Sequence, residues 1–157
     1  TLGINLVLGG IGAPVCASQA AIKKKKVLVS MRLSDSLSNA ESYFYAEVKR
    51  LKYILDCVRT EDCFVLLDEI LRGTNSEDKQ FGTMEYIKQL ISTNVLGIIA
   101  THDLEVCKLE ESYPDALSNR NFAVEIINNE LAFDYKLRAG ICNSKSASFM
   151  MKKMGVI

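Results

Sequence analysis

The sequence predicts an α/β fold, with a mostly parallel sheet flanked by helices and followed by a β-hairpin and a closing helix. Two short apolar runs, 64–67 and 97–100, are typical of buried strands, and each follows a stretch with helical spacing of its apolar residues. Strands that alternate with helices favour a parallel sheet covered on both faces. Beyond Pro114 the period changes to two, which is typical of an antiparallel hairpin.

The N-terminal part contains one expected helix and one expected strand. Residues 2–8 are apolar with small residues and predict a helix that the glycines and proline within 9–14 bring to an end. Residues 27–29 predict a short strand, and the four lysines at 23–26 before it are typical of a solvated edge. Residues 34–41 are polar and rich in turn formers, which predicts a loop.

Two amphipathic helices are expected, one before and one after the first buried strand in the sequence. The first begins near Ser42, and its apolar residues recur at helical steps: Phe44, Val48, Leu51, Leu55 and Val58. The second spans 79–91 and has one apolar side, formed by Phe81, Met84, Ile87 and Ile91. The aromatic entry of the first helix, Tyr43-Phe44-Tyr45, favours core and interface packing over a base-stacking platform, because no basic residues interleave with it.

The C-terminal residues predict a hairpin and a helix. Residues 122–127 and 131–137 alternate in polarity around Asn128-Asn129, a pair that suits a two-residue turn less well than Asn-Gly does. Gly140 ends this pattern, and the apolar stretch 147–154 predicts a short closing helix.

Composition limits the class of protein. With 157 residues and 48% apolar content, the chain can bury a core, and its length is typical of one domain. A formal net charge of zero argues against a surface built mainly to grip nucleic-acid phosphates, although a local patch or another region of a longer polypeptide would escape this test. The five cysteines are scattered and odd in number, which indicates neither a zinc site nor a disulfide framework and fits the reducing cytoplasm.

The apolar stretches and the start of the sequence support two further expectations, about membrane contact and about chain length. No apolar stretch approaches the roughly 20 residues that a membrane-spanning helix needs, so no membrane contact is expected from this segment. The start at Thr1 lacks both an initiator Met and the basic start of a signal peptide, so we expect the sequence to be part of a longer chain.

Asp68 and Glu69 are the first candidate functional residues, because they directly follow the buried strand 64–67. Ionised carboxylates are costly to place beside a core unless something neutralises them. A magnesium-bound nucleotide would explain the pair, and a surface turn is the plain alternative.

His102, the chain's only histidine, follows the neighbouring strand 97–100. Ligands in parallel sheets bind at the carboxyl ends of strands, so we expect Asp68, Glu69 and His102 to share one rim. For nucleotide hydrolysis, Asp68 suits the Mg²⁺ shell through a water, Glu69 suits polarisation of the attacking water, and His102 suits a hydrogen bond to the γ-phosphate. A strand-end histidine that merely satisfies a turn is the plain alternative.

A phosphate-binding loop is missing from these residues. A Walker A loop has the pattern G-x-x-x-x-G-K-S/T, and none of the nine glycines is followed by Lys. The run Gly9-Gly10-Ile11-Gly12 follows an expected helix rather than a strand, which favours a plain loop.

Three segments together resemble a known family. They are Ser42-Tyr-Phe-Tyr-Ala-Glu47, Leu66-Leu-Asp-Glu-Ile-Leu-Arg-Gly-Thr-Asn-Ser-Glu-Asp78 and Ala100-Thr-His-Asp103. They resemble the ATPase domain of the MutS DNA mismatch-repair proteins, an ABC-type P-loop NTPase, and the resemblance covers 1–157. It implies that the Walker A loop precedes Thr1, and that the ligands are ATP and Mg²⁺.

The resemblance also assigns residues one by one. Asp68 and Glu69 match the Walker B pair, and His102 matches the switch histidine. Ser42 matches the signature serine, which acts on the ATP of a second copy of the domain, and Asn75 lies with Arg72, Gly73 and Thr74 in the loop joining the two ATP sites of the dimer. DNA would be bound through other domains of the full-length protein.

The sequence departs from the family pattern in two places. The loop after Glu69 reads Ile-Leu-Arg-Gly-Thr-Asn-Ser, where mismatch-repair members have Gly before the Arg and Ser-Thr after the Thr, and the segment after Ser42 is rich in aromatics. Both features are closer to the shorter MutS-related proteins that lack the mismatch-reading domain. A transporter or chromosome-maintenance ATPase is a rival, but these carry a Leu-Ser-Gly-Gly type signature where this chain has Leu37-Ser-Asn-Ala40. A non-catalytic dimerisation module is the rival from another class.

Overall fold

The computed structural model describes residues 1–31, 43–142 and 146–157. The expected loop 34–41 and Ser42 lie outside the described residues. The described chain forms two compact units, Thr1–Val106 and Cys107–Ile157.

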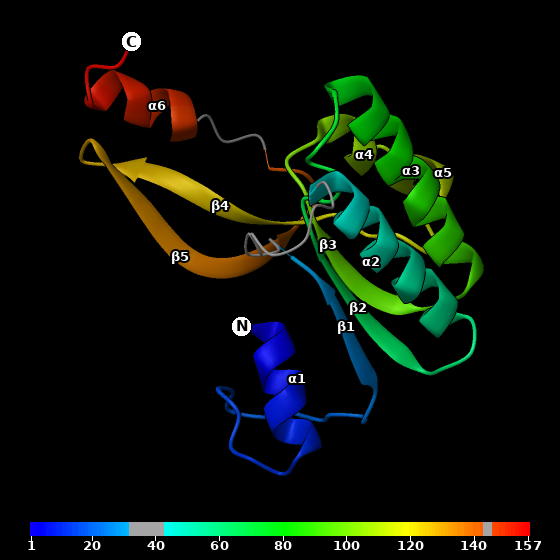
Figure 1. Ribbon diagram of the computed structural model, residues 1–157. Coiled ribbons are helices and arrows are strands. Elements are labelled where there is room, and N and C mark those ends of the chain that lie inside the picture. The colour runs from blue at the N-terminus through cyan, green and yellow to red at the C-terminus, as the bar shows by residue number, and fades with distance from the viewer. Residues whose placement is uncertain (32–42, 143–145) are drawn as a thin grey trace. The chain divides into compact units, whose positions relative to one another are not determined.

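A three-stranded parallel sheet is the centre of the first unit. It consists of β1 (Lys26–Ser30), β2 (Cys63–Asp68) and β3 (Leu96–Ala100), in the order β1-β2-β3 (Figure 1). In register, Val65 lies beside Leu28 on one side and Gly97 on the other. The prediction of an α/β fold with a parallel sheet is confirmed.

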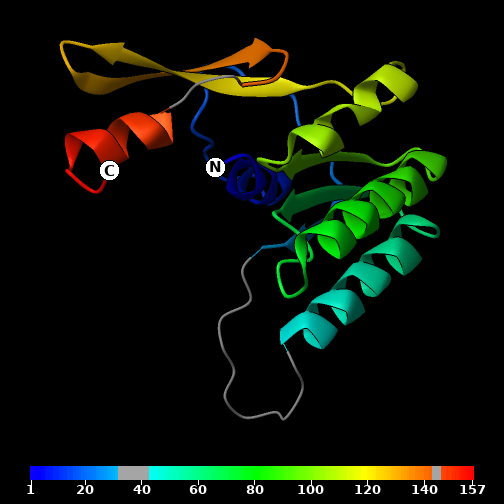
Figure 2. The same cartoon turned by 90° about the horizontal axis from the view of Figure 1, so that it is seen from above.

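Helices lie on both sides of this sheet. The helices α2 (Tyr43–Val58) and α3 (Ser76–Ser92) lie on one side, and α1 (Leu2–Gly10) lies on the other (Figure 2). Gly3 allows α1 to approach β2 closely, because a Cβ at this position would lie 2.5 Å from Leu66 Cδ1. The expected helix 2–8 is confirmed, and it continues through Gly9 to Gly10.

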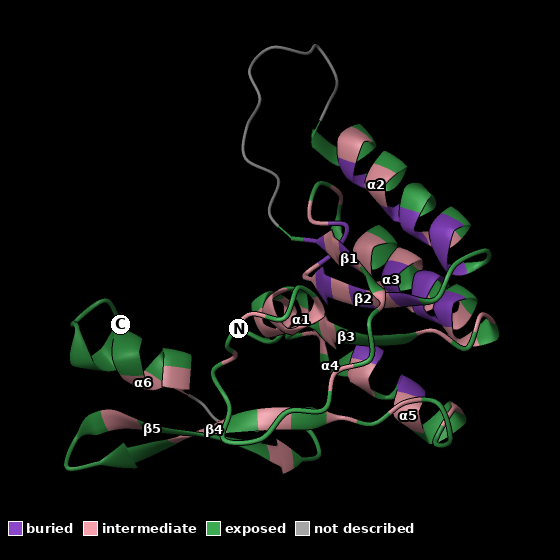
Figure 3. Cartoon of the chain, turned by 90° about the horizontal axis from the view of Figure 1, so that it is seen from below, coloured by how far each residue is buried: buried purple, intermediate pink, exposed green. Residues whose placement is uncertain are grey.

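The core lies between the sheet and the pair α2 and α3, where the buried residues gather (Figure 3). Burial alternates along β2, so that Cys63, Val65 and Leu67 face these helices. Ile54 of α2 is fully buried in the same cluster. The phenol of Tyr86 on α3 donates a hydrogen bond of 2.9 Å to the Leu51 carbonyl, and burial raises the pKa of this phenol.

Both amphipathic helices are present, but each apolar stripe is exposed at one end. Phe44, Val48 and Phe81 are exposed, the last at 69%. The buried residues are Glu47, Leu51, Ile54, Cys57 and Val58 on α2, and Thr83, Tyr86, Ile87 and Leu90 on α3. Apolar spacing locates an amphipathic helix, but the opposing surface decides which side docks, and Glu47 and Tyr86 enter the core because each finds a hydrogen-bond partner.

The expectation of cover on both faces holds for β1 and β2 but not for β3. On the α1 side, Leu96 lies beside Phe64 and Ile98 lies beside Leu66. Leu96 and Ile98 are exposed, so α1 does not cover this part of the sheet.

The second unit contains the predicted hairpin and closing helix. Strands β4 (Arg120–Ile127) and β5 (Glu130–Ala139) pair antiparallel, and α6 (Ser146–Lys153) follows. Asn128 and Asn129 have φ of 52° and 60°, and two left-handed central residues define the type I′ turn of a two-residue hairpin. Lys153 of α6 donates to Glu130 Oε1 at 2.8 Å and to the Asn129 carbonyl at 2.9 Å, which ties α6 to the turn.

Two short helices were not predicted. They are α4 (Leu104–Cys107), at the boundary of the two units in the chain, and α5 (Leu109–Ser112). Each spans four residues, too few for a helical period to be visible in the sequence. Within the described ranges, no helix has the length and apolar character needed to cross a membrane.

Candidate active site

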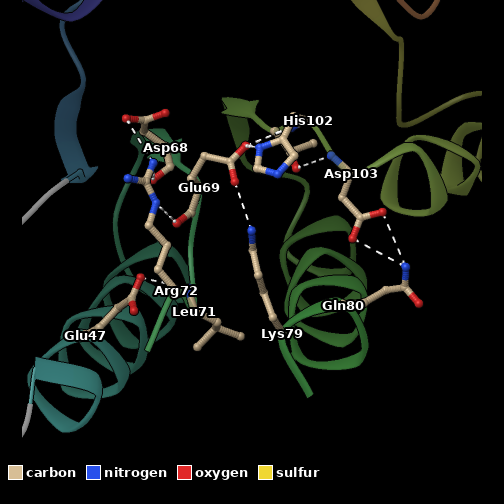
Figure 4. Close-up of polar contacts among 10 residues, drawn as sticks. Glu47, Asp68, Glu69, Leu71, Arg72, Lys79, Gln80, His102 and Asp103 are labelled. Carbon is tan, nitrogen blue, oxygen red and sulfur yellow. Dashed lines mark hydrogen bonds and ion pairs between the residues drawn. The ribbon is translucent and has the colours of Figure 1, made fainter. Parts of the chain in front are cut away.

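The candidate site lies at the carboxyl ends of β2 and β3. The Glu69 N–H continues the strand pairing by donating to the Ala100 carbonyl at 3.0 Å. Parallel pairing therefore brings the residues after β2 next to those after β3. As expected, Glu69 and His102 meet at one rim (Figure 4).

Both oxygens of the Glu69 carboxylate are engaged. Oε1 accepts a hydrogen bond of 2.7 Å from the His102 backbone N–H and lies 2.8 Å from His102 Nδ1. Oε2 accepts a hydrogen bond of 3.0 Å from Lys79 Nζ on α3. The Glu69 side chain is 14% exposed, whereas that of His102 is 83% exposed.

These contacts determine the ionisation of Glu69. Burial by itself raises the pKa of the carboxyl, but the Lys79 ammonium and the His102 N–H outweigh it and lower the pKa below its usual value. Glu69 is therefore ionised at neutral pH. A lowered pKa adds stability above the usual carboxyl pKa, and this contribution is lost as pH falls through the lowered value.

Asp68 is held loosely and apart from this cluster. Its Oδ2 lies 3.7 Å from Arg72 Nη2, and its side chain is 36% exposed. Within the described ranges, no group of three or more His, Cys, Asp or Glu side chains is placed to hold a metal. Mg²⁺ keeps several waters and often takes one or two carboxylates together with substrate phosphates, so a single accessible carboxylate fits that ion.

The loop after Glu69 has an unusual backbone. Glu69 has φ of 50° and Leu71 has φ of 59°, and neither is glycine. Such residues persist only where the surroundings fix them. Here Arg72 Nε donates to the Glu69 carbonyl at 2.8 Å, which closes the loop on itself.

Glu47 of α2 fixes the same loop from the core. Its side chain is buried, and Oε1 accepts a hydrogen bond of 2.7 Å from the Leu71 N–H. Its second oxygen has no partner among the residues that the structure describes. Gly73 lies against α2 as well, because a Cβ there would come within 2.9 Å of Phe44 Cβ. The loop beside the acidic pair is thus tied to α2 at two positions.

Replacing Glu47 by Ala should lower the free energy of unfolding by about 1–3 kcal/mol, because it leaves the buried Leu71 N–H without an acceptor. Glu47→Gln keeps an acceptor and should cost less. Asp56→Ala on the exposed side of α2, where Asp56 pairs with Lys52, is the matched control and should change stability by less than about 0.5 kcal/mol. Denaturant unfolding measures all three, and equal losses for Glu47→Ala and Asp56→Ala would refute the role of this bond.

Asn75 begins α3. Its Oδ1 accepts from the Asp78 N–H at 2.9 Å, and its Nδ2 donates to Asp78 Oδ2 at 2.8 Å. Asn75 is therefore an N-cap, a structural use that the sequence interpretation did not include. One turn later, Gln80 Nε2 donates to the Asp103 carboxylate at 3.3 Å, so α3 is also tied to the residues after β3.

The structure thus brings some of the predicted site residues together and leaves others apart. Glu69 and His102 are in contact, and Asp68 instead lies 3.7 Å from Arg72. Asn75 caps α3, and Ser42 lies outside the described residues. The sequence interpretation missed Lys79 and Gln80, for which the sequence offered no signal. It also missed the role of Glu47, although the helical spacing of Glu47 with Leu51, Ile54 and Val58 was visible.

An open pocket of about 400 Å³ adjoins these residues and is lined by Glu69, Arg72, Lys79 and His102. Because the Lys79 ammonium pairs with Glu69, an anionic ligand in this pocket would meet Arg72 and His102, and the Glu69 carboxylate could hold a water. The chain is therefore an α/β protein with a polar site in the crevice at the carboxyl ends of parallel strands, where open α/β sheets bind ligands.

Comparison with known proteins assigns the chain to a family. The family model of MutS domain V matches residues 1–156, and the chain belongs to the MutS family. It is 27% identical over 147 residues to MutS protein homolog 4 of Homo sapiens, covering 89% of this chain and 16% of that protein. It is 34% identical over 143 residues to the DNA mismatch repair protein MutS of Protochlamydia amoebophila, covering 88% and 16%.

A third relative is similar over nearly the whole chain. The DNA mismatch repair protein MutS of Prochlorococcus marinus is 30% identical over 159 residues, covering 99% of this chain and 17% of that protein. The chain therefore spans less than a fifth of the length of these relatives.

Proposed function

We propose that the chain is part of an ATP-binding and ATP-hydrolysing domain of a MutS-family protein, which couples MgATP turnover across a dimer to DNA binding by other domains. The observation that carries this proposal is the Glu69 carboxylate. It is ionised, sits at the carboxyl end of β2 and meets His102 beside an open pocket. A surface turn would not require two separate segments, α3 and the residues after β3, to converge on one carboxylate.

Each residue has a role in this proposal. Glu69 accepts a hydrogen bond from the attacking water and orients it. His102, already fixed through Nδ1, presents its other ring nitrogen to the phosphate being transferred. Asp68 would hold Mg²⁺ through a water, and the bound ion would neutralise charge on the phosphate oxygens.

The second copy of the domain enters through the family resemblance. Ser42 is proposed to act on the ATP of that copy, and Asn75 is proposed to lie near the junction of the two ATP sites. Two relatives are named DNA mismatch repair proteins and another is named MutS protein homolog 4, and we extend to this chain a role in mismatch repair or related DNA processing.

Residues 1–157 alone should bind ATP weakly or not at all, because they lack the Gly-rich loop and Lys that supply much of the contact to the phosphates. A longer polypeptide that supplies a Walker A loop before Thr1 should bind MgATP and hydrolyse it. Titration calorimetry of both chains, with ATP turnover of the longer one, measures the difference.

Two results would contradict the proposal. Tight, Mg²⁺-dependent ATP binding by residues 1–157 would show that the phosphate site has been placed wrongly. A longer chain with an intact Walker A loop, dimeric yet without ATP turnover, would favour the non-catalytic dimerisation module.

A further inference from the structure

The proposed mechanism leaves one charged contact of Glu69 unused among the described residues, the contact with Lys79. Its ammonium lies 3.0 Å from Glu69 Oε2, and the two side chains are only 22% and 14% exposed. Lys79 also lines the pocket with Glu69 and His102. A sheltered ion pair of this kind holds its geometry better than a surface pair, because water and salt screen it less.

The position of Lys79 is fixed by the start of α3. The Asn75 cap holds the first turn, and Gln80, the residue after Lys79, is bonded to Asp103. Two residues further on, Gly82 packs tightly on the loop, because a Cβ there would lie 2.7 Å from Leu71 Cδ1. The backbone that bears Lys79 is therefore held beside Glu69 rather than swinging over the pocket.

The two oxygens of Glu69 are not equally available to a water. Oε1 has two nitrogen atoms of His102 within hydrogen-bonding distance, whereas Oε2 has one contact in the described part of the chain, the Lys79 ammonium. A water that Glu69 is to orient must hydrogen-bond one of these oxygens. Oε2 has the fewer contacts of the two, and there the water competes with a fixed cation.

We propose that Lys79 is a positioning residue that restrains Glu69, holding Oε2 in an ion pair and so slowing the step in which Glu69 engages the attacking water. This inference rests on the proposed function, because it assigns Lys79 a part in ATP hydrolysis. Lys79 acts through Glu69 and is not itself a ligand of the nucleotide. Its removal therefore changes the rate of the chemical step and leaves nucleotide binding as it was.

The test uses the full-length protein with its Walker A loop. Lys79→Met keeps the length of the side chain and removes the cation, and it should raise kcat about three- to tenfold with KM changed less than about twofold. Lys79→Arg keeps a cation within reach and should bring kcat back toward the wild-type value. Lys88→Met removes another lysine of α3, paired with Glu85 away from the pocket, and serves as the matched control.

Two further measurements separate restraint from other roles. The Kd of a non-hydrolysable ATP analogue should be the same within about twofold for wild type and Lys79→Met, whereas loss of a phosphate ligand would weaken it. In a Glu69→Gln background, Lys79→Met should have no effect on kcat, because the group that it restrains is absent.

The outcomes distinguish this inference from the function on which it rests. If the wild-type protein shows no Mg²⁺-dependent turnover, or if Glu69→Gln leaves turnover unchanged, the proposed function fails and the role of Lys79 falls with it. If both behave as proposed but Lys79→Met lowers kcat, leaves it unchanged or weakens analogue binding, the proposed function stands and the restraint by Lys79 is overturned.

Discussion

Glu69→Gln, in a protein that includes the Walker A loop, should cut ATP hydrolysis by about two to four orders of magnitude while leaving ATP binding largely intact. Gln retains an oxygen that can accept from the His102 N–H, so the rim keeps its shape. It lacks the negative charge that polarises a water, and the loss of a positioned base typically costs about 10²–10⁴ in rate. Single-turnover hydrolysis and equilibrium ATP binding, measured on the same preparations, separate the two effects.

Asp68→Asn should act differently, because Asp68 is proposed to hold Mg²⁺. The Mg²⁺ concentration needed for half-maximal ATP binding should rise, while hydrolysis at saturating Mg²⁺ should fall less than in Glu69→Gln. Glu85→Gln on the exposed side of α3 controls for the loss of one negative charge. If Asp68→Asn and Glu69→Gln lost binding equally and neither selectively slowed turnover, the division of roles would be wrong.

The second large effect is expected for Ser42, and it distinguishes a two-subunit ATPase from a self-contained one. On general grounds, a serine before a helix is an N-cap that bonds a backbone N–H of the first turn. The family resemblance instead directs Ser42 toward the γ-phosphate bound by the partner, where a positive helix terminus adds to the attraction. Each ATP site would then need Ser42 from one subunit and the Walker A Lys from the other.

Mixed dimers make this prediction measurable. One subunit carries Ser42→Ala with an intact Walker A Lys, and the other keeps Ser42 but has that Lys replaced. Neither homodimer contains a complete site, whereas the mixed dimer contains one. ATP turnover should therefore appear only on mixing. An inactive mixture in which heterodimers are shown to form would return Ser42 to the role of a helix cap.

The elements that the sequence predicted well are those whose pattern is local. The strand 64–67, the hairpin around Asn128-Asn129 and the helix 2–8 each carry their own period or turn chemistry, and each was found within a few residues of its observed bounds. The side on which a helix packs is not determined by a local sequence pattern. Phe81 continued an apolar stripe and is nevertheless exposed, because the surface opposite α3 receives Thr83, Tyr86 and Leu90 instead.

The same distinction applies to the site. Glu69 and His102 were placed at one rim because parallel strands bring their carboxyl ends together, a rule that needs only the strand assignments. The contact of Lys79 with Glu69 depends on the direction in which α3 starts from the loop and on the position of its first turn. Residue spacing in the sequence encodes neither. The burial of Glu47 likewise depends on the left-handed loop that presents the Leu71 N–H to it.

That bond between Leu71 and Glu47 has a consequence for observing the protein at work. The Leu71 amide lies outside every helix and strand, so its protection from hydrogen exchange depends on a single side-chain acceptor on α2. Its proton can exchange only when α2 and the loop beside the acidic pair separate, by local opening or by complete unfolding. Deuterium uptake at this one amide therefore reports whether the helix that begins next to Ser42 is seated against the loop that follows Glu69.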